Sequence, residues 1–141
     1  MSATFSRVFE IHGRDFTNAG RVSTEIKDLL KGMGIDSAFV RRVAIASYEA
    51  EMNVVMYARH AMVVLTVTPG VIALEIADEG PGIPDVEQAM QEGFSTATPE
   101  MREMGFGAGM GLPNIKRNSD VFSIDSMVGH GTRLGVRVHV G

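Results

Sequence analysis

The sequence predicts an α+β fold in which helices cover one face of a β-sheet. Five segments have strand patterns and three have helical patterns, in the order strand, helix, helix, strand, strand, long loop, helix, strand, strand. The chain has 141 residues, enough for one core and too few for two, so we expect a single domain over residues 1–141. Three helices and about five strands at this length predict a two-layer α/β sandwich with a mixed sheet and the helices on one face.

The first half of the chain supplies one strand and two helices. Residues 4–13 have a strand pattern that ends in glycine. We expect a helix over residues 15–34, with Asp15 or Thr17 as its N-cap and glycines as its stop signals. A second, longer helix is expected over residues 36–61, because an Asp-Ser capping pair opens a long apolar stretch.

The second half supplies two hairpins, separated by a long loop and a helix. Pro69-Gly70 forms the turn of the first hairpin, and "VGHG" at residues 128–131 forms that of the second. A loop as long as the one between the hairpins is usually a functional lid or disordered. The expected segments are strands 62–68 and 71–78, a long loop that holds only a short helical piece near residues 86–91, a helix 112–119, and strands 121–126 and 132–140.

Composition excludes several classes of protein. The net charge is −4 and the sequence has no block of Lys and Arg, so it lacks the basic surface of a nucleic-acid binder. The absence of cysteine excludes disulfides, cysteine-ligated zinc and thiol catalysis. No apolar run reaches the roughly 18 residues of a membrane span, and the N-terminus has no signal-peptide core. We therefore expect a cytoplasmic protein that binds neither nucleic acid nor membrane.

The long helix carries a carboxylate and an amide on one face. Glu49 and Asn53 are four residues apart, which places them about 40° from each other around the helix axis. One interpretation is that this face meets solvent at its edge, since Arg42 and His60 also fall on it. The other is functional: the carboxylate orders a water or hydroxyl, and the amide oxygen helps to hold a hard cation.

A second acidic side chain ends the buried row of a strand. Alternation in "VIALEIAD" places Ile72, Leu74, Ile76 and Asp78 on one face. An ionised carboxylate at the end of an apolar row is costly unless it accepts strong hydrogen bonds. The following "EGPGI" has glycines that let the backbone approach a flat ligand closely. The simpler alternative is that Asp78 caps a turn.

The last strand begins its inward row with a threonine. Thr132 shares a face with Leu134, Val136 and Val138, so its hydroxyl is expected beside Asp78. The alternative is that Thr132 is there only because threonine favours strands.

Four glycines alternate immediately before the third helix, at positions 105, 107, 109 and 111. They free the backbone to wrap an anion with its N–H groups, and the helix that follows presents its positive end. The dinucleotide fingerprint, the P-loop and the protein-kinase glycine loop do not match this stretch. Phosphates in another nucleotide-binding fold, or a flexible hinge, would explain the glycines.

Together these motifs resemble the GHKL superfamily of gyrase-, histidine kinase- and MutL-type ATPases, which share the Bergerat fold. The resemblance rests on E-x-x-x-N in a helix, D-x-G-x-G-I after a strand, a long loop, the alternating glycines before a helix, and G-T at the last strand. It covers nearly the whole chain, roughly from Arg41 to the end by motif and the rest by the order of the predicted elements. "YEAEMNVVMYA" and "GMGLPNIKRNSD" are most similar to bacterial anti-sigma factor and switch serine kinases.

The resemblance implies a role for each motif residue. Glu49 is the expected catalytic base, Asn53 the ligand of Mg²⁺, and Asp78 the acceptor of the adenine amino group. Arg102 and Lys116 are candidates for contact with the terminal phosphate, and Pro84 to Met104 form the expected ATP lid. The remaining expected nucleotide-binding residues are Gly80, Gly82 and Ile83 at the base, Thr132 through a water, and Gly105, Gly107, Gly109, Gly111 and Leu112 as phosphate cradle and lid hinge.

The resemblance also implies an activity and partners. We expect an ATP- and Mg²⁺-dependent serine/threonine kinase that phosphorylates a small anti-sigma-antagonist-like protein. A sigma factor or another regulator is an expected second partner, and pairing into a homodimer is an open expectation. Two alternatives remain at this stage: a non-catalytic module whose ATP-ordered lid makes a docking surface, and an ATPase or histidine-kinase-like catalytic domain acting in trans.

Overall fold

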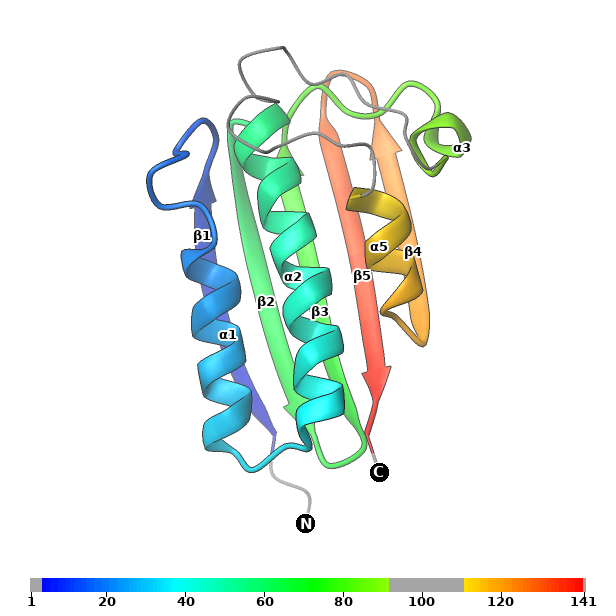
Figure 1. Ribbon diagram of the computed structural model, residues 1–141. Helices are drawn as coiled ribbons and strands as arrows, with labels where there is room; N and C mark the ends of the chain where they lie inside the picture. The colour runs from blue at the N-terminus through cyan, green and yellow to red at the C-terminus, as the bar shows by residue number, and fades with distance from the viewer. Residues whose placement is uncertain (1–3, 92–110, 141) are drawn as a thin grey trace.

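The computed structural model describes residues 4–91 and 111–140, which form a five-stranded sheet with helices against one face (Figure 1). The strand order is β1-β2-β3-β5-β4. Figure 1 shows α1, α2 and α5 side by side in one layer. The elements are β1 Phe5–His12, α1 Arg21–Gly32, α2 Ser37–Tyr57, β2 His60–Thr68, β3 Val71–Glu79, α3 Val86–Ala89, α5 Gly111–Arg117, β4 Val121–Met127 and β5 Gly131–His139.

The predicted α+β sandwich is confirmed, but the sheet is antiparallel throughout rather than mixed. The connections explain the difference. Two helices, α1 and α2, join β1 to β2, so the chain returns to the end of the sheet where β1 stopped and the two strands run in opposite directions (Figure 1). Strands β3 and β4 run in the same direction, but β5 lies between them and is antiparallel to both.

The core lies between the sheet and the helix layer. Inward-facing residues alternate along β3 and β5, as predicted: Ile72, Leu74 and Ile76 on one strand, and Leu134, Val136 and Val138 on the other. The helices contribute further fully buried side chains, among them Ile26, Leu30, Val43, Val54 and Ile115. Because β3 and β5 are antiparallel neighbours, the inward row of β3 ends beside the start of the inward row of β5, at one edge of the core.

Helix α1 begins later than predicted and is capped from another helix. It starts at Arg21 after Gly20 in a left-handed conformation, not after Asp15 or Thr17. Glu51 of α2 is 2% exposed and accepts the N–H groups of Gly20, Val22 and Ser23 at 3.1, 3.2 and 2.9 Å. A carboxylate at this position satisfies the free donors and the positive end of the helix together. A distant side chain in this role leaves no local signal in the sequence of α1.

Helix α2 begins as predicted and ends earlier. Asp36 is its N-cap and accepts from the N–H of Ala38. The predicted end at residue 61 is wrong, because Ala58 is already extended and β2 begins at His60. Pairing of His60 with His12 on β1 and with Glu79 on β3 extends the ladder over these residues. None of the helices in the described ranges combines the length and apolarity needed to cross a bilayer.

We expect Glu51→Ala to destabilise the fold by about 3 kcal/mol or more, because two buried N–H groups and one part-buried N–H group lose their acceptor. Urea unfolding measures the change. The matched control is Glu75→Ala on β3, an exposed glutamate paired with Arg133, for which we expect less than about 0.5 kcal/mol. Similar losses in the two variants would contradict the capping role of Glu51.

Candidate functional site

Asp78 lies where the inward row of β3 ends, half-buried beside the start of β5. The backbone N–H of Thr132 donates to Asp78 Oδ1 at 3.0 Å. Burial raises the pKa of the Asp78 carboxyl above its ordinary value, and the Thr132 N–H offsets part of that rise. No donor among the described residues bonds to Oδ2. The carboxylate is thus desolvated and has one oxygen available for a ligand.

Glycines keep the surroundings of this carboxylate open. Gly82 and Gly131 have φ angles of 75° and 139°, which L side chains rarely adopt. A methyl group on Gly131 would overlap the carbonyl oxygen of Asp78, and one on Gly80 would lie 3.1 Å from Asp78 Oδ1. Larger residues at these positions would therefore fill the space beside the carboxylate or displace it.

Ser126 of β4 ties the glycine turn to β5. Its hydroxyl accepts from the Ile83 N–H at 2.8 Å and lies 2.8 Å from the Thr132 hydroxyl. The Thr132 hydroxyl was expected beside Asp78, but it pairs with Ser126 and the Thr132 N–H reaches the carboxylate instead. Sequence analysis missed Ser126. It ends the half-buried row of β4 after Phe122 and Ile124, and that alternation was the signal available.

A second carboxylate, Glu49, lies on α2 beside the first residue of α5. Glu49 and Asn53 are both half-buried, and a methyl group on Gly111 would lie 3.2 Å from Asn53 Oδ1 and 3.5 Å from Glu49 Oε2. Burial raises the pKa of Glu49, and a long hydrogen bond of 3.5 Å from Asn114 Nδ2 works against that rise. The structure therefore brings Glu49 and Asn53 of α2 close to Gly111, the last of the four alternating glycines. Asn114 was not among the predicted site residues.

The residues that were placed together on this face of α2 have different surroundings in the structure. Arg42, which was placed on the same face, forms a two-pronged ion pair with Asp120 at 3.0 and 3.2 Å. His60 is not on the helix at all but in β2. Glu49 and Asn53 are thus left as the polar groups at the end of α2 that adjoin α5.

The other predicted residues divide into described and undescribed ones. Leu112 is buried in the first turn of α5, and Lys116 is exposed in its last turn. Gly105, Gly107, Gly109, Arg102 and residues 92–104 of the expected lid lie outside the described residues. Within the described part of the chain, no three His, Cys, Asp or Glu side chains form a metal cluster.

We expect Ser126→Ala to lower stability by about 1–2 kcal/mol, because the Ile83 N–H loses its acceptor. Hydrogen exchange at the Ile83 amide should accelerate at least tenfold, while core amides of β3 change much less. Ser123→Ala, on the opposite face of the same strand, is the matched control. An unchanged Ile83 exchange rate would show that Ser126 does not hold the turn.

Comparison with known proteins agrees with this arrangement. A family model described as the histidine kinase-like ATPase domain matches residues 14–138. The serine/threonine-protein kinase RsbT of Bacillus subtilis (strain 168) is 33% identical over 112 residues, which are 77% of this chain and 78% of that protein. The anti-sigma F factor of Caldanaerobacter subterraneus subsp. tengcongensis is 39% identical over 70 residues, covering 50% of this chain and 46% of that protein.

A further anti-sigma F factor, from Heyndrickxia coagulans, is 28% identical over 115 residues, or 82% of this chain and 72% of that protein. The residues matched by the family model include both carboxylates of the site and strands β2, β3, β4 and most of β5, whereas β1 precedes them. The resemblance inferred from the motifs is confirmed, and the chain belongs to the histidine kinase-like ATPase domain family.

Proposed function

We propose that this protein is an ATP-dependent serine/threonine kinase of the anti-sigma and switch-kinase type. The observation that carries the proposal is the placement of two half-buried carboxylates, Asp78 and Glu49, whose pKa values are both raised by burial. Perturbed carboxylates beside glycine-rich turns are typical of functional sites. The kinase RsbT and the anti-sigma F factors among the relatives support this class of activity.

Asp78 would select adenine. Its Oδ1 already accepts from the Thr132 N–H, which leaves Oδ2 to accept from the exocyclic amino group of the base. That hydrogen bond would offset the desolvation that the carboxylate suffers at the end of the β3 row. Gly80, Gly82 and Ile83 would lie against the base, with Thr132 contributing through a water. Ser126 would hold this turn in place.

Glu49 would act at the other end of the nucleotide. Its carboxylate would accept the proton of the acceptor serine or threonine while that oxygen bonds to the γ-phosphorus and the bond to ADP breaks. The products are ADP and the phosphorylated side chain, so atoms and charge balance. The Asn53 amide oxygen suits Mg²⁺, which would neutralise phosphate charge when bound with ATP. Gly111, together with Leu112 and the preceding glycines, would contact the phosphates.

The proposed substrate is a small anti-sigma-antagonist-like protein, and a sigma factor or another regulator is a second proposed partner. Support comes from the relatives named as anti-sigma F factors. Binding of such a partner would link the activity to transcription. Two alternatives remain distinguishable from this proposal: an ATP-gated binding module would bind ATP without transfer, and a catalytic domain acting in trans would hydrolyse ATP without labelling a serine of the partner.

We expect Asp78→Asn to weaken ATP binding about 30-fold or more, because the amide that replaces Oδ2 is a donor facing the donor amino group. Calorimetry with ATP and Mg²⁺ measures the change. Glu75→Gln, on the exposed face of the same strand, is the control and should bind ATP like the wild type. Wild-type affinity in Asp78→Asn would remove Asp78 from the nucleotide site.

We expect Glu49→Gln to bind ATP within about threefold of the wild type and to lose phosphoryl transfer at least 100-fold. Labelled ATP and a panel of purified anti-sigma-antagonist proteins supply the assay. Because Glu49 must be ionised and burial raises its pKa, wild-type transfer should decline as the pH falls through that raised value, at a higher pH than for an ordinary glutamate. Undiminished transfer by Glu49→Gln would exclude Glu49 as the base.

A further inference from the structure

We propose that a basic groove between α1 and α2 docks an acidic segment of the protein that carries the acceptor hydroxyl. The inference rests on the proposed kinase function and adds the location and the chemistry of partner binding. The groove has a volume of about 830 Å³. Its lining comes from the two helices alone: Ser23, Thr24, Lys27 and Lys31 of α1, and Ser37, Ala38, Val40, Arg41, Ala44, Ile45, Tyr48 and Glu49 of α2.

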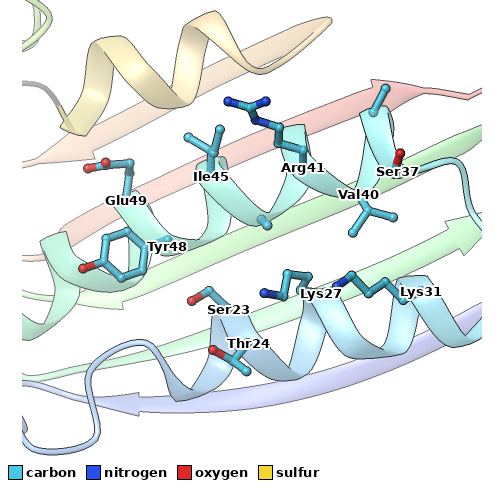
Figure 2. Close-up of a pocket in the computed structure, with 12 residues that line it drawn as sticks. Ser23, Thr24, Lys27, Lys31, Ser37, Val40, Arg41, Ile45, Tyr48 and Glu49 are labelled. Atoms are coloured by element: carbon cyan, nitrogen blue, oxygen red, sulfur yellow. The ribbon is translucent and has the colours of Figure 1, made fainter.

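The groove is positively charged in a chain whose net charge is −4. Three of its four charged lining residues are basic: Lys27, Lys31 and Arg41. Figure 2 shows the side chains of Lys27 and Lys31 in the space between α1 and α2. A local cluster of one sign in an oppositely charged protein attracts a ligand of the opposite sign and steers its approach.

The three cations are not neutralised within the described part of the protein. None of Lys27, Lys31 and Arg41 forms an ion pair with a described carboxylate. The adjacent Arg42 differs, because it is bound by both oxygens of Asp120. The ion pair of Arg42 therefore joins α2 to Asp120, the residue before β4. Arg41 has no carboxylate partner among the described residues and is available to bind an external anion.

Apolar surface accompanies the charge. Ile45 and Tyr48 of α2 line the groove, and Tyr48 is 43% exposed. Tyrosine and arginine are enriched at protein interfaces, where the tyrosine ring supplies contact area and its hydroxyl a hydrogen bond. This mixture suits a polypeptide better than a small inorganic anion.

The groove leads directly to the proposed catalytic carboxylate. Arg41, Ile45 and Glu49 follow each other at intervals of four along one face of α2, so the basic end lies about 12 Å from Glu49 along the helix axis. Figure 2 shows this line of side chains, with Glu49 at its end. An extended segment covers about 3.3 Å per residue, so acidic residues roughly four positions from the acceptor serine would reach the cations.

The first test uses the acceptor protein that the wild-type chain phosphorylates. For Lys27→Glu/Arg41→Glu we expect the KM for that acceptor to rise about tenfold or more, with kcat and the Kd for ATP within about twofold. Arg137→Glu, a matched reversal on the exposed side of β5, should leave all three unchanged. Unchanged thermal unfolding of the Lys27→Glu/Arg41→Glu variant shows that a higher KM comes from lost docking and not from misfolding. The milder Lys27→Gln/Arg41→Gln serves the same purpose, because it removes the two charges without reversing them. An unaltered KM in both groove variants overturns the proposal.

A second test does not depend on catalysis. Fluorescence anisotropy with a fluorescein-labelled decaglutamate peptide should show binding by the wild type and by Arg137→Glu, weakened by salt. Binding should be at least about tenfold weaker in Lys27→Glu/Arg41→Glu. If wild-type chain transfers no phosphate but binds the peptide in this pattern, the kinase proposal fails and the groove stands. Equal binding by all variants, or displacement of the peptide by ATP alone, overturns the groove as a protein-docking site.

Discussion

The hydrogen bond from the Thr132 N–H to the Asp78 carboxylate is the contact on which the site depends. It forms because β3 and β5 are antiparallel neighbours, so that the inward row of β3 ends beside the start of the inward row of β5. Gly131 allows the close approach of the two strands, and Ser126 fixes Thr132 and the turn after Asp78. A partly buried carboxylate with a hydrogen bond to only one oxygen costs free energy in the unliganded protein. A ligand that donates a hydrogen bond to the other oxygen recovers part of this cost.

Two glutamates on α2 illustrate how the surroundings decide a role. Glu51 is more deeply buried than Glu49, yet it accepts three backbone N–H groups and closes the N-terminus of α1. Glu49 has one long contact with Asn114, and burial raises its pKa. A carboxylate with several donors stabilises the fold, whereas one with a single long hydrogen bond carries a desolvation cost. This difference makes Glu49, rather than Glu51, the candidate for a functional role, where proteins tolerate such a cost.

Alternation and helical spacing were sufficient to predict the inward rows of β3 and β5, the shared face of Glu49 and Asn53, and the helix layer. They were not sufficient where a distant group decides the outcome. The start of α1 depends on Glu51, which is 29 residues from Val22, and the hydroxyl of Thr132 on β5 pairs with Ser126 on the neighbouring strand β4. Strand direction was missed for a related reason: two helices between β1 and β2 reverse the chain, which local patterns do not encode.

The central claim is that Asp78 recognises the amino group of adenine. Calorimetry of the wild-type protein with Mg²⁺ and either ATP or inosine triphosphate tests it most directly, since inosine carries a carbonyl oxygen in place of that amino group. We expect inosine triphosphate to bind at least about tenfold more weakly, because an acceptor would face the Asp78 carboxylate. Equal affinity for the two nucleotides would contradict the account.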